Sequence, residues 1–234
     1  MVRVLAAREA GRRQDAGVTT SDASERFRQR RAEFWGAIGT IGETRRRLGE
    51  LDEGSLWPSG SSSYLRVTTA HAGIIATDGL SDPTGADGSG ARPGLGLELY
   101  IEGVELLDDD PATGRWLMVV LEEAAGAVAG AWESVGDALV EHGLLSLELP
   151  GTGAPQEWLA HDRLGALIGV ELPGRPTGFD VDGAPVRVLS VTPLRPSELA
   201  VITQDGAVGR RRVADALSAA GWYSYADTDR EAVL

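Results

Sequence analysis

The 234-residue sequence contains neither cysteine nor lysine. Without cysteine, the chain can form no disulfide, use no thiol nucleophile and bind no metal through thiolates. Because no disulfide framework points to secretion, we expect a cytoplasmic protein. Without lysine, the phosphate-binding pattern Gly-x-x-x-x-Gly-Lys-Ser/Thr is excluded as well.

Long apolar runs are also missing. No stretch approaches the roughly 20 apolar residues that a membrane helix needs, and the apolar part of Met1–Arg8 is too short for a signal peptide. We therefore predict no membrane association. Residues 1–20 are rich in Arg, Ala and Gly without a clear period, and they predict a disordered leader. Residues 21–234 are enough for a single well-filled domain.

Charge is distributed unevenly along the chain. The net charge is −13; residues 1–47 hold 11 arginines against 6 acidic residues, whereas residues 48–234 hold 11 against 29. An acidic body argues against nucleic-acid binding, which needs positive charge at the phosphates. It favours a basic protein partner. The alternative is that the acidic residues only keep the protein soluble, which explains the excess of acidic over basic residues equally well.

Signatures of catalysis and metal binding are scarce. The three histidines have no metal-binding spacing, and neither HExxH nor Gly-x-Ser-x-Gly occurs. Asp108–Asp110 lacks the alternating ligands of a calcium loop. We therefore expect no cofactor, no metal and no enzyme activity. The alternative is a hydrolase that uses Asp78, Asp82 and Glu98, but aspartates in such turns usually bind their own backbone.

The segment Ile74–Glu102 organises the rest of the chain. It begins with a short apolar run, and the turn residues of Asp78–Pro83 close that run. A Gly/Asp/Pro-rich loop follows, and then Gly94–Glu102 alternates with a period of two. That period predicts a half-buried strand with Leu95, Leu97, Leu99 and Ile101 on one face and Gly96, Glu98, Tyr100 and Glu102 on the other.

The remaining pattern predicts both helices and strands. Helices are expected at 23–38, more weakly at 40–51, at 116–132, from Pro196 to about Gly206, and at 211–220. Strands are expected at 64–69, 72–77, 144–149, 164–172 (with a helix as the alternative), 179–181, 186–191 and 222–225 (with an extended tail as the alternative). Residues 135–143 are expected as a turn or short strand. The sum is an α+β domain with a mixed, mostly antiparallel sheet of about six strands packed with helices.

Several motifs resemble the suppressor of fused family. The turn Gly79-Leu80-Ser81-Asp82, followed by the strand Gly96-Leu97-Glu98-Leu99, is similar to that family's signature. Further similar features follow in order: Trp116-Leu117, Gly136-Asp137, the strand 186–191 with Glu198-Leu199, and Trp222 with Thr228-Asp229-Arg230. The resemblance covers residues 63–230 and implies the fold of the family's N-terminal domain.

The resemblance also implies a function. Family members of known role bind proteins and are not enzymes; the animal protein clamps a peptide as an added strand between two domains, and this chain matches only the first. Some bacterial single-domain relatives come from toxin–immunity loci, which suggests an immunity protein that neutralises a basic toxin. The expected partner-binding residues are Asp78, Ser81, Asp82, Asp87, Gly88, Glu98 and Tyr100. In this chain Pro83-Thr84 stands where the family has an aromatic residue.

A third hypothesis needs neither a partner protein nor a reaction. The stretch 116–132 is apolar and rich in small residues, so it would let another element approach closely. On this hypothesis the protein is a structural subunit that oligomerises through that helix.

Overall fold

The computed structural model describes residues 20–46, 56–58, 60, 62–84, 92–108, 110 and 112–234. Residues 1–19 of the expected leader, and the expected contact residues Asp87 and Gly88, lie outside the described residues. In chain order, the elements are α1 (Thr20–Gly36), β1 (Thr40–Arg46), β2 (Ser63–Thr68), β3 (Gly73–Thr77), β4 (Pro83–Thr84), β5 (Arg92–Pro93), β6 (Leu97–Gly103), the 3₁₀ turn η1 (Val104–Leu107), α2 (Arg115–Gly130), α3 (Trp132–His142), β7 (Leu145–Leu149), η2 (Gln156–Trp158), β8 (Leu159–Ala160), β9 (Arg163–Ile168), β10 (Gly178–Val181), β11 (Ala184–Leu194), α4 (Pro196–Ala219) and β12 (Tyr225–Ala226).

One mixed sheet organises these elements. Its strand order is β1-β2-β3-β6-β11-β9-β7, and β10, β12 and β8 add beside β11, β6 and β9. β6 runs parallel to β11 and β12, and the other neighbours in this sheet are antiparallel. The prediction of an α+β fold with a mostly antiparallel mixed sheet is confirmed. The expected six strands were too few, because the sheet has ten.

Strand β6 lies at the centre of the sheet, between β3 and β11, and all of its residues are buried. Leu97, Leu99 and Ile101 join the core beneath α2, as their alternation predicted. The expectation of a half-buried strand is wrong, because the opposite face carrying Glu98, Tyr100 and Glu102 is buried as well. A central strand with polar residues on one face must find partners for them inside the protein.

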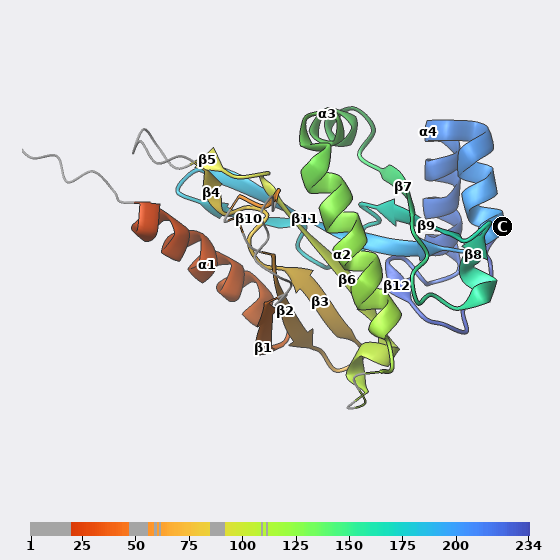
Figure 1. The fold of residues 1–234 in the computed structure, drawn as a ribbon, viewed down its shortest axis with the longest axis horizontal. Helices are drawn as coiled ribbons and strands as arrows, with labels where there is room; N and C mark the ends of the chain where they lie inside the picture. The colour runs from red at the N-terminus through yellow and green to blue at the C-terminus, as the bar shows by residue number, and fades with distance from the viewer. Residues whose placement is uncertain are drawn as a thin grey trace, which may run out of the picture.

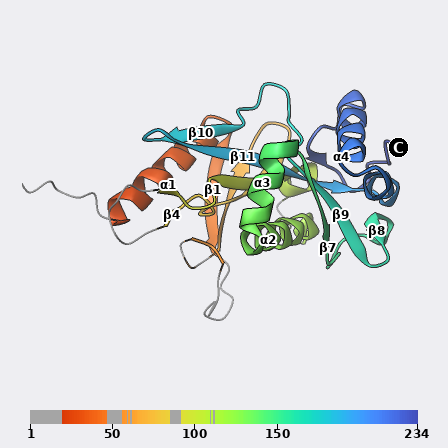
Figure 2. The same cartoon turned by 90° about the horizontal axis from the view of Figure 1, so that it is seen from above.

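Helices cover the two faces of the sheet differently (Figures 1 and 2). On one face α2 packs against β3, β6, β7 and β11, and α3 lies beside it. The buried residues of α2 include Leu117, Val120 and Leu121, so the apolar stripe proposed for self-association packs into this chain's own core. On the other face, Phe34 and Trp35 of α1 pack with Leu65 and Val67 of β2.

The N-terminal helix is close to its prediction, but the segment that follows it is not. α1 spans Thr20–Gly36 instead of 23–38, and Thr40–Arg46 forms strand β1 where a second helix was expected. β1 pairs antiparallel with β2 at the end of the sheet. The β-branched residues Thr40, Ile41 and Thr44 favour the extended conformation of an edge strand. The local preferences for helix and for strand are both weak here, and hydrogen bonding to β2 favours the strand.

The segment 132–142 also differs from its prediction. It forms helix α3 instead of a turn or short strand, with Val135 and Leu139 buried four residues apart on one side. Gly143, with φ 72°, ends the helix in the left-handed conformation that glycine adopts at little cost. The break at Ala131, which separates α3 from the longer helix α2, obscured this pattern in the sequence.

Two turn predictions are confirmed. Asp182 and Gly183, with φ of 54° and 85°, connect β10 to β11 as the Asp-Gly hairpin signal predicted. Gly206, with φ 59° and ψ −125°, interrupts α4 at the expected position, so Pro196–Ala219 contains two helical segments. No helix within the described ranges is long and apolar enough to cross a membrane.

Candidate functional site

The candidate site forms where the turn after β3 folds over β6. Oε1 of Glu98 accepts hydrogen bonds from the backbone N–H of Gly79 at 3.3 Å and of Ser81 at 3.0 Å, and Oε2 accepts one from Leu80 at 3.3 Å. The hydroxyls of Ser81 and Thr77 donate to the same carboxylate at 2.6 and 2.5 Å. Three successive N–H groups converge on one carboxylate, which requires a tight turn, and Gly79 supplies its φ of 141°.

Arg31 of α1 completes this arrangement from the other side. Its Nε donates to Asp78 at 2.7 Å, Nη2 donates to Asp82 at 2.8 Å, and Nη1 contacts Glu98 at 3.2 Å. Nη1 also donates to the hydroxyl of Ser81 at 2.9 Å. The five residues Arg31, Asp78, Ser81, Asp82 and Glu98 are called the Arg31 cluster below. The cluster ties α1 to the β3–β4 turn and to β6, three segments far apart in the sequence.

The cluster is buried unequally. The side chains of Arg31 and Glu98 are 2% and 0% exposed, whereas Asp78 and Asp82 keep 16% and 17% of their surface. The part of the cluster that reaches solvent is therefore a pair of aspartates, with the guanidinium and the glutamate beneath them. In this structure Glu98 presents no surface to a partner.

Three carboxylates surround one guanidinium, and this excess of negative charge affects their protonation. Burial raises the pKa of Glu98 above its ordinary value, although Arg31 and the hydroxyls of Ser81 and Thr77 oppose the shift. Burial likewise raises the pKa of Asp82 against the effect of Arg31. Burial alone would lower the pKa of the Arg31 guanidinium. The negative charges of Glu98, Asp82 and Asp78 outweigh burial and raise this pKa above its ordinary value, so the guanidinium stays charged.

This geometry bears on the hydrolase hypothesis. Asp78, Asp82 and Glu98 do converge, as that hypothesis requires, but Arg31 contacts a carboxylate oxygen of each. A nucleophile or general base needs a free oxygen in reach of a substrate, and Glu98 has none, since it is fully buried and both of its oxygens accept hydrogen bonds. In the described part of the chain, no group of three His, Asp or Glu residues could hold a metal ion.

A second buried ion pair lies two pleats further along the same face of β6. Arg175 reaches Glu102 at 2.9 Å, and the hydroxyl of Ser224 donates to Glu102 at 2.5 Å. The guanidinium of Arg175 also lies 5.6 Å from the ring centre of Tyr100, a distance at which cation and ring attract. Burial, followed by the charge of Glu102, raises the pKa of Tyr100 to about 12.

A third buried pair joins α4 to the C-terminal segment. Arg230 donates to both oxygens of Glu198, at 2.6 and 2.8 Å, and both side chains are fully buried. Glu198 also accepts from the backbone N–H of Arg195 and of Val233, at 2.9 and 3.0 Å. The two-point geometry orients the planar guanidinium against the carboxylate.

The structure brings together four of the residues predicted for partner binding: Asp78, Ser81, Asp82 and Glu98. Tyr100 lies on the same face of β6, but it is only 4% exposed and faces the ring of Trp35 at 5.6 Å between centres. Sequence reasoning missed the role of two arginines. The role of Arg31 could have been suspected, because this arginine occupies a position of the apolar stripe of α1 between Phe27 and Phe34. Arg175 lies in a loop, where no sequence pattern indicates burial.

The fold and the buried ion pairs together describe the class of protein. It is an α+β domain built on one mixed sheet, and the central strand of this sheet carries glutamates that pair with arginines from distant segments. No family model and no curated protein matches the sequence. Among solved structures, the fold is similar to a chain in the crystal structure of the Sufu–Fu complex, with 13% identity, a TM-score of 0.54 and coverage of 90% of this chain and 92% of that chain.

A crystal structure of Drosophila Suppressor of Fused is also similar, with 14% identity, a TM-score of 0.40 and coverage of 82% of this chain and 42% of that chain. The likeness to the chain of the Sufu–Fu complex confirms the fold that the sequence motifs implied. Identities this low show a shared fold alone, because one fold can host many functions.

Proposed function

We propose that this chain is a non-enzymatic protein-binding domain of the suppressor of fused type. The observation that carries the proposal is the likeness of 90% of the chain to a chain in the crystal structure of the Sufu–Fu complex, an assembly of bound partners. The buried use of the candidate catalytic carboxylates is consistent with it, since Arg31 holds them as structural groups.

The charge of the chain supports a basic partner. Residues 48–234 carry 29 acidic residues against 11 arginines, and such an excess attracts a basic protein and speeds their encounter. We propose further that the domain acts as an immunity protein that binds and neutralises a basic toxin. Complementary charge, and not a buried reaction centre, would then provide specificity.

The proposed contact surface lies around the β3–β4 turn. Asp78 and Asp82 reach solvent there, and the strand pair β4–β5 continues from the same turn. A partner could contact the two aspartates or add a strand at a nearby edge, as peptide-binding domains commonly do.

The test is affinity capture from the native cell lysate at low and high salt, followed by titration calorimetry with the purified protein that is retained. We expect one basic protein, bound more weakly as salt increases. The Asp82→Asn variant should bind it more weakly, whereas Asp137→Asn, on the exposed side of α3, should not change the affinity. If no protein is retained above a bait of equal negative charge, the proposed function is wrong.

A further inference from the structure

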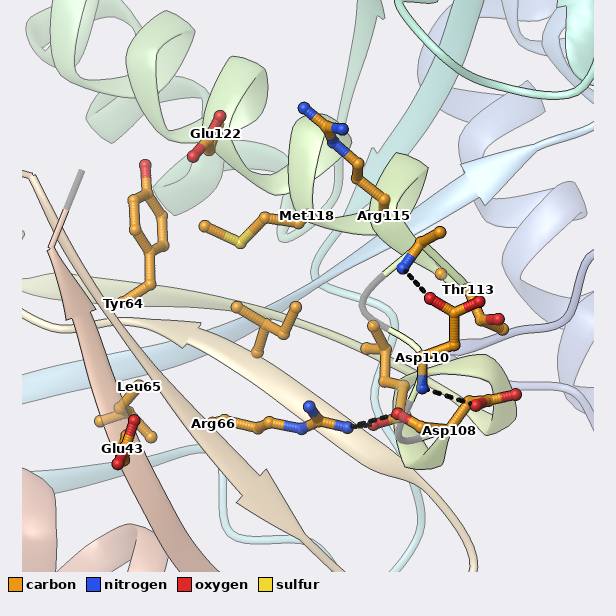
Figure 3. Close-up of a pocket in the computed structure, with 14 residues that line it drawn as sticks. Glu43, Tyr64, Leu65, Arg66, Asp108, Asp110, Thr113, Arg115, Met118 and Glu122 are labelled. Carbon is orange, nitrogen blue, oxygen red and sulfur yellow. Dashed lines mark hydrogen bonds between the residues drawn. The ribbon is translucent and has the colours of Figure 1, made fainter. Parts of the chain in front are cut away.

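Strand β7 closes one end of the main sheet (Figures 1 and 2). It pairs with β9 on one side, and no other described strand pairs with its second side. The chain is described without a gap from residue 112 to 234, so the segments that lead into and out of β7 are all placed. This distinguishes β7 from β1 at the other end of the sheet. It also distinguishes β7 from the hollow of about 530 Å³ beside β1, lined by Tyr64 and Met118 (Figure 3), because both border residues outside the described ranges.

The register shows which backbone groups of β7 point outward. Backbone groups of a strand point alternately to its two sides. The N–H of Gly169, directly after β9, donates to the carbonyl of Ser190 in β11 at 3.0 Å. The even-numbered residues of β9 therefore point the other way, toward β7, where they pair with the odd-numbered residues. Ser146 and Glu148 consequently direct their backbone N–H and C=O groups away from β9.

Only part of this outward edge is shielded. Nη2 of Arg163 donates to the carbonyl of Glu148 at 2.6 Å. Among the described residues, none bonds to the carbonyl of Ser146 or to the N–H of Ser146 or Glu148. An edge strand with unpaired groups is a template for another strand, and proteins usually shield such edges with charges or a covering element. Here three of the five residues are leucines, and Leu145 and Leu147 are only partly buried.

A hollow of about 330 Å³ adjoins the end of β7, between the strand and α2. Leu149 and Pro150 line it from the strand, and the exposed residues Gly126 and Ala127 line it from α2. A Cβ on Gly126 would meet no atom within 4 Å. The small residues of α2 therefore leave room beside the edge for the side chains of an added strand.

The charge around this edge selects the kind of strand. Glu148 is exposed and Glu123 of α2 lines the hollow, and neither forms an ion pair with a described residue. Glu122 also lines the hollow, but it already has an interaction partner. Arg163 is a cation at the same edge, so the carboxylates of Glu123 and Glu148 exceed it by one charge. Because the whole chain carries a charge of −13, it repels a second copy and attracts a basic segment.

We propose that an extended basic segment of the partner protein adds to the sheet beside β7. Its backbone would pair with Ser146 and Glu148, and the carbonyl of Glu148 would exchange Arg163 for an N–H of the added strand. Its lysines or arginines would face Glu123 and Glu148. Strand addition takes affinity from main-chain hydrogen bonds and specificity from side chains. The inference rests on the proposed function, since it gives the same protein-binding activity a contact separate from the Arg31 cluster.

Hydrogen exchange of backbone amides, followed by NMR, tests the edge before any ligand is added. We expect the amides of Ser146 and Glu148 to exchange roughly tenfold faster than the amide of Leu147, which bonds to β9. Equal protection of the three amides would overturn the inference, because the edge would then be covered.

The probe for binding is a blocked seven-residue peptide that alternates valine and lysine. One control peptide carries glutamate in place of each lysine, and a second carries N-methyl groups on its backbone nitrogens, which removes the donors that strand pairing needs. We expect the lysine peptide to slow the exchange of Ser146 and Glu148 in a saturable manner, while Leu147 stays unchanged. Both control peptides should bind roughly tenfold more weakly.

Variants of the protein separate the backbone contribution from the charge contribution. Ser146→Pro removes one outward N–H and leaves the ladder to β9 intact, and an edge strand tolerates proline where the nitrogen faces outward. We expect it to bind the lysine peptide roughly tenfold more weakly, with its folding checked by circular dichroism. Glu148→Arg, at an exposed position, should weaken binding similarly. Glu133→Arg on the exposed side of α3 and Asp82→Asn in the Arg31 cluster should leave peptide binding unchanged.

The inference is wrong if the lysine peptide leaves the exchange of Ser146 and Glu148 unchanged, if the N-methylated peptide binds equally well, or if Glu148→Arg binds like wild type. Protection that rises with protein concentration alone would indicate a second copy at β7 and would also overturn it. These results are distinguishable from failure of the proposed function. A captured partner that binds wild type and Ser146→Pro equally well would reject only the β7 contact, whereas the absence of any partner would reject the function.

Discussion

Replacing Arg31 with methionine keeps a long side chain in the Arg31 cluster but removes its charge. Four hydrogen bonds and contacts disappear, to Asp78 at 2.7 Å, Asp82 at 2.8 Å, Ser81 at 2.9 Å and Glu98 at 3.2 Å. Breaking a buried ion pair by removing one partner typically costs about 3–5 kcal/mol, because the remaining charge is left buried and uncompensated. Since domains are stable by about 5–15 kcal/mol, we expect Arg31→Met to lose a large part of the free energy of unfolding.

Urea unfolding followed by tryptophan fluorescence measures this loss. The chain has six tryptophans, and Trp35 of the same helix is fully buried beside Tyr100, so the emission reports on global unfolding and includes the packing of α1. For a chain of this size, the expected loss corresponds to a fall in Tm of about 10 °C. Arg30→Met is the matched control, because Arg30 lies on the exposed side of α1 with 55% of its side chain accessible. We expect its unfolding midpoint to match wild type.

A second substitution tests the cause of the loss. Adding Glu98→Gln to Arg31→Met removes the deepest uncompensated carboxylate, so the double variant should be less destabilised than the sum of the two single variants. Coupled groups in contact typically show interaction energies of about 0.5–3 kcal/mol. If Arg31→Met unfolds within about 1 kcal/mol of wild type, or if the two changes simply add, Arg31 does not compensate the buried carboxylates and the reasoning is refuted.

Three further outcomes are expected. Burial raises the folded-state pKa of Glu98 and of Glu102, so the folded state binds protons at a higher pH than the unfolded state does. The free energy of unfolding, measured by urea titration, should therefore rise as the pH falls from 7.5 toward 5. Glu198→Gln breaks a fully buried ion pair and should cost about 3 kcal/mol, with faster hydrogen exchange in the C-terminal segment. A Cβ at Gly73 would lie 2.4 Å from a backbone oxygen, so Gly73→Ala should lower stability by at least about 1–3 kcal/mol. Gly126→Ala, in open space on a helix, should instead raise it by about 0.5–1 kcal/mol.

Each of these outcomes has a contrary result. A fall in stability as the pH decreases from 7.5 to 5 would mean that the arginine partners lower the pKa of these carboxylates more than burial raises it. Unchanged exchange at the C-terminus in Glu198→Gln would mean that the pair does not hold this segment. Equal effects of the two glycine substitutions would contradict the close approach at β3.

The elements that could be predicted are those in which local pattern and burial agree. The period of two in 95–102 predicted β6, the Asp182-Gly183 turn predicted a hairpin, and Gly206 predicted the break in α4; all three are present. In each case the deciding property belongs to a few neighbouring residues, namely alternation or access to positive φ.

The failures occur where the deciding partner is distant in the sequence. Thr40–Arg46 forms a strand because the backbone groups along the edge of β2 are available for hydrogen bonding. The polar face of β6 became buried because α1 and a loop supply Arg31 and Arg175. No local window contains both members of these pairs.

Motifs that are separate in the sequence meet in the fold. The turn 79–82 and the strand 96–99 meet at the carboxylate of Glu98, and the Glu198-Leu199 helix meets Thr228-Asp229-Arg230 in the buried Glu198–Arg230 pair. The features that suggested suppressor of fused therefore include residues that hold the fold together. This explains why they indicate the fold more firmly than they indicate a binding surface.

By itself, the sequence determined the α+β class, the central strand, the principal turns and an acidic body without cysteine, because these depend on composition and on contacts between near neighbours. Only the tertiary structure decided that Glu98, Glu102 and Glu198 are buried partners of arginines, and that α1 is tied to the β3–β4 turn through Arg31. Both depend on which distant segments come within about 3–4 Å of each other, the range at which charges form ion pairs and side chains pack.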